Sequence, residues 1–191
     1  MYYEKSVKLS VAIFYLFLCI PVFSLPIFNE SLPADNPTQE AALLVQKLIT
    51  SEDSEKSEIF KQFKNLLDEN PENINVRKMY INSLLADRYY AEGLQELEIL
   101  NKKHFTRTDL LTECMVKERL GKRDDECYRQ VIHLSEQQQS IDSDYLTALF
   151  FANDKRFEPL KNRLIKEGVF KESDLLIFTL SKETMLREFY P

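Results

Sequence analysis

The sequence contains no tryptophan, three glycines and two histidines among its 191 residues. Hairpin turns and phosphate-binding loops depend on glycine for positive φ angles, and Gly93, Gly121 and Gly168 are too few and too scattered to build them. Leucine, glutamate, lysine, glutamine and alanine, which favour helices, are abundant instead. The composition therefore predicts an all-α protein and argues against nucleotide-binding folds.

Residue combinations that carry catalysis or bind metals are also scarce. His104 and His133 are 29 residues apart, and neither has a second histidine or a cysteine pair at the spacing of metal ligands. The GxSxG turn that presents many serine nucleophiles is absent from the sequence. We therefore expect no metal, no cofactor and no enzymatic activity. The competing hypothesis is a hydrolase with a dispersed carboxylate site, because a sequence this acidic offers many paired carboxylates.

The charge balance bears on the kind of partner. The chain has 25 Lys and Arg residues against 31 Asp and Glu residues, which gives a net charge of −6 at pH 7. Proteins that bind nucleic acid neutralise phosphates with clustered Lys and Arg. An acidic chain of this kind is expected to have no nucleic-acid partner.

The first 24 residues have the order of residue types that marks a secretory signal peptide. Lys5 and Lys8 precede a nearly uninterrupted apolar run over residues 9–20, and Pro21 ends that run. Residues that signal peptidase tolerates follow the proline, which predicts cleavage after Ser24. Residues 1–24 are therefore interpreted as a signal peptide for export.

Two alternatives for this segment stay open. An uncleaved membrane anchor needs about 18 or more consecutive apolar residues, whereas the run before Pro21 has twelve. A lipoprotein would be acylated on Cys19, but Leu18 before it is bulkier than the small residue that precedes a lipobox cysteine.

The rest of the chain divides into a short linker and one domain. Residues 25–38 hold three prolines among polar residues and are predicted to be extended. Residues 39–191 have a length that suits a single domain, and no second apolar span appears in them. We expect no stable membrane span in the mature chain. Its predicted location is the bacterial periplasm, with secretion from the cell as the alternative.

From residue 39 onward, apolar residues recur at helical spacing and short polar segments interrupt them. Connections of two to five residues make neighbouring helices antiparallel. A last helix, with Ser173 or Asp174 as its N-cap, is expected to cover the exposed face of the final pair. The predicted helices span residues 39–50, 56–69, 74–87, 90–103, 108–120, 124–138, 142–153, 156–167 and 174–189.

A loose period of 34 residues relates units that start at residues 40, 74 and 108. In the second unit, residues 70–73 (NPEN) form a proline-containing turn, Tyr90 occupies an aromatic position and Gly93 a small one. Cys127 follows Gly93 at the same period, whereas Ile81 stands where a small residue is expected. The chain resembles tetratricopeptide (TPR) proteins with degenerate repeats. The alternative is an irregular helical bundle.

The resemblance implies a short solenoid of stacked helical pairs with a C-terminal capping helix, and a groove that binds a protein or peptide. It implies that residues of the first helix of each unit meet the partner, and Arg77, Tyr80 and Tyr145 are the candidates. We expect an adaptor or assembly factor. Within the same class, an immunity protein that neutralises a toxin or secreted effector is the alternative, because an acidic protein suits a basic toxin.

Cys114 and Cys127 both remain after cleavage, and an oxidising compartment would allow them to bond. They lie on neighbouring predicted helices at comparable distances from the turn between them, so they could face each other. In the chain-entropy model, a disulfide across a loop of this size stabilises the fold by about 3 kcal/mol. Two reduced cysteines that serve as small core residues are the alternative.

Overall fold

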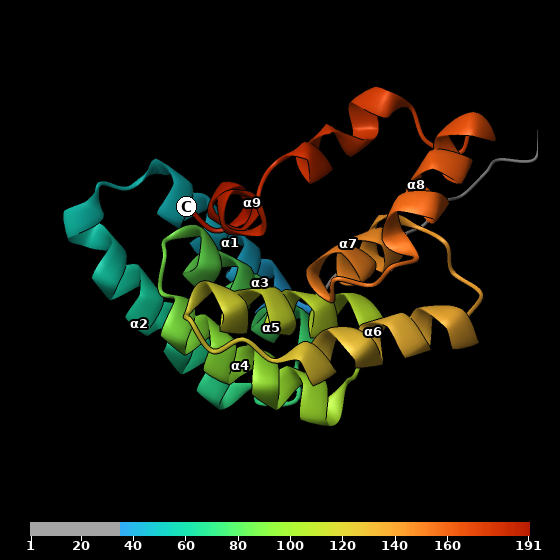
Figure 1. The fold of residues 1–191 in the computed structure, drawn as a ribbon. Coiled ribbons are helices and arrows are strands. Elements are labelled where there is room, and N and C mark those ends of the chain that lie inside the picture. Colours follow the sequence, from blue (N-terminus) through green and yellow to red (C-terminus); the bar gives the residue numbers. More distant parts are fainter. Residues whose placement is uncertain (1–34) are drawn as a thin grey trace, which may run out of the picture. The chain divides into compact units, whose positions relative to one another are not determined.

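The computed structural model describes residues 35–191. The predicted signal peptide, residues 1–24, and most of the predicted linker lie outside the described residues. Within the described part, every element is helical, as the composition predicts (Figure 1). The elements, in chain order, are α1 (Asn36–Thr50), α2 (Asp53–Glu69), α3 (Ile74–Ala86), α4 (Tyr90–Lys103), α5 (Arg107–Arg119), α6 (Asp125–Gln137), α7 (Ser143–Phe151), α8 (Phe157–Lys166), the 3-10 helix η1 (Glu172–Thr179) and α9 (Lys182–Phe189).

Six of the helices in the described part begin at short polar side chains that bind their exposed N–H groups. Asp124, for example, accepts hydrogen bonds from the backbone N–H groups of Glu126 and Cys127. Such a cap satisfies donors that have no partner within the helix. Because Asp35 caps α1, this helix begins at Asn36, three residues before its predicted start. The same kind of cap is supplied by Asn73 to α3, Thr106 to α5, Asp142 to α7 and Ser181 to α9.

Three helical pairs turn in the same way, although their sequences differ. Arg88, Gly121 and Asn153 follow the first helix of successive pairs, and each has a positive φ, of 69°, 73° and 54°. They lie 33 and 32 residues apart. After each of them the next N–H group bonds to a carbonyl five residues back, which closes the helix end. The same closure follows α6 at Gln139 and α8 at Gly168, so this geometry ends second helices as well as first ones.

Each helix packs on the next one along the chain, from α1 through α8. In addition α1 packs on α3 and α5 on α7, while Lys78 on α3 reaches Asp109 on α5 at 2.8 Å. The first helices of the pairs therefore lie side by side. We call the side of α1, α3, α5 and α7 that points away from α2, α4 and α6 the inner face.

The C-terminal segment differs from its prediction. Instead of one helix over residues 174–189, the chain forms η1 and then α9, with extended backbone at Leu180 and Ser181 between them. Ser181, rather than Ser173 or Asp174, caps the final helix. The break allows the apolar residues of this segment to pack against two different parts of the fold. One straight helix would hold them along a single line. After the break the two short helices pack in different places.

Aromatic contacts show where η1 packs. The Phe178 ring of η1 lies 5.4 Å from Phe150 and 5.1 Å from Phe157, centroid to centroid. Helix η1 therefore covers the last pair, α7 and α8. The sequence predicted this position for the whole segment of residues 174–189. Helix α9 instead runs back and packs on α5 (Figure 1).

Candidate interaction surfaces

All three residues predicted to meet a partner are buried, and two of them, Arg77 and Tyr80, pack between helices. Arg77 is 7% exposed, forms an ion pair with Glu96 and donates a hydrogen bond to the carbonyl of Pro71. The Tyr80 ring lies 5.3 Å from the ring of Phe63, and burial raises the pKa of its hydroxyl. In this structure both side chains contribute to packing, and a binding role for them stays a prediction.

Tyr145, the third candidate, lies at a groove although it is only 8% exposed. Its hydroxyl donates a hydrogen bond to Glu136 at 3.0 Å. Burial, followed by this hydrogen bond to a carboxylate, raises the pKa of the Tyr145 hydroxyl. The edge of its ring remains the part that a ligand in the groove would reach.

The predicted cysteine pair is joined. Cys114 on α5 and Cys127 on α6 form a disulfide, with Cα atoms 5.6 Å apart. Both residues are also buried, at 0% and 6% exposure. The bond therefore crosses the interior of the third helical pair and ties α5 to α6.

On α5, the inner face is covered by the chain's own last helix. Glu113 of α5 reaches α4 through Asn101, Cys114 bonds to α6, and Thr108 reaches α7. Thr112 hydrogen-bonds the Tyr190 side chain, directly after α9. Arg119 donates to the carbonyl of Tyr190 and also lies 5.2 Å from the ring centroid of Tyr90 on α4. Helix α9 thus lies over α5, on the side that carries Thr112, with its end beside the start of α4.

Polar contacts hold both ends of α9. At its start, the Lys182 ammonium donates to the carbonyl of Phe151 at 2.9 Å. At its end, the Arg119 guanidinium donates to the carbonyl of Tyr190 at 2.8 Å, and the Tyr90 hydroxyl donates to the carbonyl of Pro191. Burial raises the pKa of the Tyr190 hydroxyl to about 12. The final residues are therefore an integrated part of the fold.

Over α1 and α3 no part of residues 35–191 covers the inner face. Val45 and Ile49 of α1 and Met79 and Ala86 of α3 line a groove there. Ile49 is 78% exposed, the highest value among the large apolar residues of the described chain. We call this the inner groove; its volume is about 410 Å³, and its walls are Val45, Leu48, Ile49, Lys56, Met79, Asn82, Ser83, Ala86 and Asp87.

One end of the inner groove is charged. The Lys56 ammonium, from the first turn of α2, lies 2.6 Å from a carboxylate oxygen of Asp87 and 3.2 Å from Asp53. Hydrogen bonds to these two carboxylates raise the pKa of Lys56. The remaining walls are mostly apolar, so the groove combines an apolar floor with one polar end.

The sequence prediction missed this groove, although a signal for it exists. Val45 and Ile49 are four residues apart on α1 and form an apolar stripe beside the core stripe of Ala41, Leu44 and Leu48, of which Leu48 also lines the groove. A second apolar stripe on a helix indicates a second surface to cover. What the sequence does not indicate is that α9 covers α5 and leaves this stripe open.

A second groove lies between the N-terminal part of α7 and α8. Its volume is about 580 Å³. Apolar residues form the floor, and Ile141 at its edge is 47% exposed. We call it the α7–α8 groove; its walls are Ile141, Tyr145, Lys155, Arg156, Pro159, Leu160 and Arg163.

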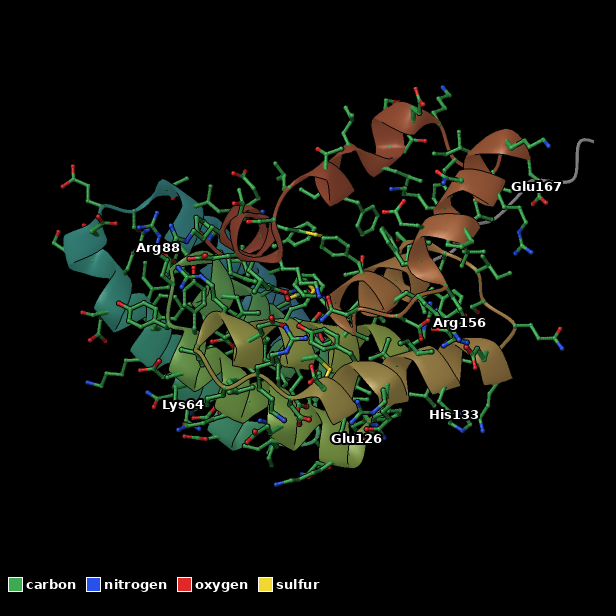
Figure 2. The ribbon with its side chains drawn as sticks, in the orientation of Figure 1. Lys64, Arg88, Glu126, His133, Arg156 and Glu167 are labelled. Atoms are coloured by element: carbon green, nitrogen blue, oxygen red, sulfur yellow. A yellow bond between two sulfur atoms is a disulfide. The ribbon has the colours of Figure 1, made fainter. Side chains whose placement is uncertain are left out.

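Arg156 organises the charges beside the α7–α8 groove. Its guanidinium lies 2.6 Å from Glu136 of α6 and 2.7 Å from Asp154 (Figure 2). The hydrogen bond from Arg156 lowers the pKa of Asp154, and the same bond raises that of Arg156. The two nearest carboxylates of this wall are thus already paired.

Residues 35–191 contain neither a candidate metal site nor a candidate membrane-spanning helix. No group of three or more His, Cys, Asp or Glu side chains is placed to hold a metal ion in this part of the chain. His133 points away from the helices into solvent (Figure 2). No helix within the described residues is long and apolar enough to cross a membrane.

Comparison with protein-family models, with curated proteins and with solved structures gave no significant match to this chain. The two grooves described above therefore carry the functional proposals.

Proposed function

We propose that the protein is an exported, non-catalytic binding protein that takes up an amphipathic helix of a partner protein on the open part of its inner face. One observation carries the proposal: the inner groove is apolar and open, and it exposes 78% of Ile49. An isoleucine left in water at this level forgoes most of the free energy that its burial would contribute, on the order of 2 kcal/mol. A partner that covers it recovers this energy.

The chain's own α9 indicates the chemistry of that partner. On the inner face over α5, α9 buries Met185 and Leu186, which are 0% and 5% exposed. Its opposite side carries charged residues, among them Glu183 and Arg187, whose side chains are 77% and 65% exposed. An amphipathic helix is therefore a ligand that this face accommodates. The proposed partner segment is similar, with apolar residues for the groove and a cation or carboxylate near the Lys56–Asp87 end.

The TPR-like interpretation belongs to the same proposal. The turns repeated at 33 and 32 residues and the side-by-side first helices are features of paired-helix arrays. Such arrays bind peptides and proteins on the face that the first helices line. An adaptor or assembly factor is the role that fits this surface.

The disulfide supports the export part of the proposal. Disulfides are typical of oxidising compartments such as the bacterial periplasm and the cell exterior. The Cys114–Cys127 bond agrees with the signal peptide proposed for residues 1–24, and the periplasm is the proposed location.

A matched pair of variants tests the binding surface. Ile49→Lys places a charge in the inner groove, whereas Leu43→Lys makes the same kind of change at a residue of α1 that is 58% exposed and lies outside the groove. In co-purification from a bacterial envelope extract, we expect Ile49→Lys to lose the partner that the wild type and Leu43→Lys retain. Equal recovery by all three proteins would refute the inner groove as the binding site.

The identity of the captured protein separates the alternatives. A secretion or envelope-assembly component indicates an adaptor, whereas a toxin domain indicates an immunity protein. Turnover of ester, glycoside or peptide substrates by the purified protein, abolished by one carboxylate variant that still folds, would refute the non-catalytic proposal.

A further inference from the structure

Charge is distributed unevenly along the described chain, and the uneven part lies at the α7–α8 groove. Residues 35–154 contain 15 Lys and Arg against 23 Asp and Glu, a net charge of −8. Residues 155–171 contain six Lys and Arg against two Glu, a net charge of +4. Residues 155–171 are thus a basic segment of an acidic protein, and three of their cations line the groove.

We propose that the α7–α8 groove is a second binding surface, which takes an acidic peptide segment of a partner and seats a large apolar side chain of that segment beside Ile141 and Leu160. This inference does not rest on the inner groove. The two surfaces share no residue.

The groove has an apolar floor between charged walls. Ile141, Pro159 and Leu160 supply apolar surface, and the ring of Tyr145 lies beside them. With a volume of about 580 Å³, the groove has room for one large side chain and the backbone that carries it. Burying such a side chain provides the affinity that an open surface of charges lacks.

The cations of the rim are not all occupied by the protein's own carboxylates. Arg156 is paired with Glu136 and Asp154. The ammonium of Lys155 has no carboxylate within 4.0 Å among residues 35–191. The guanidinium of Arg163 lies 3.9 Å from Glu167, with both side chains 55% exposed. Lys155 and Arg163 are therefore the cations that an incoming carboxylate would meet.

The acidic residues that face this rim are held by other cations. Glu136 and Asp154 accept from Arg156, and Glu158 is 2.8 Å from Lys161. Arg156 offsets one of these two negative charges, so the group of Arg156, Glu136 and Asp154 keeps a net charge of −1, and Lys155 and Arg163 are the cations left for an acidic ligand. Charge-assisted hydrogen bonds from Arg and Lys to a carboxylate are about twice as strong as neutral ones.

A peptide fits this surface better than a lipid membrane does. The apolar residues form the floor of a hollow between two helices, whereas a membrane surface is met by protruding apolar residues. The exposed apolar residues Val169 and Leu176 lie outside the groove walls. A hollow with cations on its rim selects a side chain flanked by carboxylates.

Selection from a random linear peptide library displayed on phage, with the purified oxidised protein as bait, tests the proposal. We expect the enriched peptides to be acidic and to contain a large apolar residue. A synthetic peptide of the enriched sequence should bind Arg163→Glu and Lys155→Glu roughly tenfold or more weakly than wild type, while Arg163→Lys keeps most of the affinity. The matched control is Lys166→Glu, which changes an exposed cation of α8 outside the groove walls.

Several results would overturn the proposal. The first is a selection that does not enrich acidic peptides, and the second is equal peptide affinity of wild type and Arg163→Glu. The third is a loss of peptide affinity in Lys166→Glu as large as that in Arg163→Glu, which would indicate general charge attraction. Binding to phosphatidylglycerol vesicles but not to phosphatidylcholine vesicles, abolished by Arg163→Glu while no peptide binds, would identify a membrane surface instead. Since Ile49→Lys leaves this groove intact, failure here and failure of the inner groove are distinguishable.

Discussion

The two halves of the described chain are built from the same kind of helical pair but are completed differently. Helices α1 to α4 have a buried ion pair, Arg77 with Glu96, and an inner face that is open over α1 and α3. Helices α5 to α9 have a disulfide, Cys114 with Cys127, and an inner face that α9 covers over α5. Among residues 35–191 the same face is thus covered in one half and left open in the other.

The cores of the two halves reflect this difference. In the C-terminal half one continuous cluster extends from Leu110 to Leu186 and includes residues of η1 and α9. The apolar residues of α1 to α4 form two separate clusters, one that includes Phe63 and one that includes Leu97; the second also contains Val116 of α5 and packs against Tyr190. A binding surface is therefore expected over the first cluster, which no residue after α4 joins within the described chain.

The largest expected effect is in the N-terminal half. Glu96→Ala leaves the Arg77 guanidinium buried without its carboxylate; the two side chains are 9% and 11% exposed in the wild type. Removing one partner of a buried pair costs about 3–5 kcal/mol, so we expect the free energy of unfolding in urea to fall by about 4 kcal/mol. Glu92→Ala, at an exposed residue of the same helix, should change it by less than about 0.5 kcal/mol. Similar values for the two variants would show that the pair does not stabilise this half.

Removing the disulfide is expected to have the next largest effect, in the C-terminal half. Replacing Cys114 and Cys127 with alanine should lower the free energy of unfolding by about 3 kcal/mol. Hydrogen exchange should increase first in α5 and α6, because the bond joins them. Alkylation of both cysteines in the folded, unreduced protein, or faster exchange confined to α1 and α2, would contradict this account.

Shortening a buried residue of α9 tests how firmly it covers α5. Met185 is fully buried, so Met185→Ala should cost about 2 kcal/mol, the lower end of the range for such a change because α9 lies at the edge of its cluster. Leu176→Ala, at a residue that is 61% exposed, serves as the control and should be nearly neutral. Equal effects would mean that α9 is not an integral part of the inner face.

The smallest expected effect is a dependence on pH at the start of α7. Burial alone would raise the pKa of Asp142. Hydrogen bonds from Arg107 and from the backbone N–H of Tyr145 outweigh burial, so the pKa lies below its ordinary value of 3.8. The carboxylate therefore stabilises the fold above this ordinary value, and its contribution is lost as pH falls through the folded value.

The Asp142 side chain is 41% exposed, so solvent screening limits the contribution to less than about 1 kcal/mol. Comparing the free energies of unfolding of wild type and Asp142→Asn should show a difference at neutral pH that shrinks in acid. A difference that is constant with pH would argue against the ion pair.

Much of the helical pattern could be predicted from the sequence, because the spacing of apolar residues and the polar caps are local signals. Asp124 and Asn73 precede their helices as capping rules require. The disulfide could be predicted for a similar reason, since Cys114 and Cys127 lie at comparable distances from one turn. These features depend on residues close together in the chain.

The features that the sequence did not indicate depend on distant contacts. The chain breaks at Leu180 and Ser181 because η1, before the break, packs against α7, whereas α9, after it, packs against α5. Arg77 and Tyr80 could not be assigned to core or surface, because α3 contacts helices on several sides and carries apolar residues around most of its circumference. The groove over α1 and α3 lies apart from α9 because α9 packs on α5, which no local pattern states.

The central claim is that the inner face over α1 and α3 binds an amphipathic helix of a partner. The most direct test places a photo-crosslinking benzoyl-phenylalanine at residue 49 in the exported protein and, as control, at residue 43. The account predicts that irradiation of cells yields a specific adduct from residue 49 alone, and that the crosslinked partner peptide has an amphipathic helical pattern. No adduct from residue 49, or the same adduct in equal yield from both positions, would contradict it.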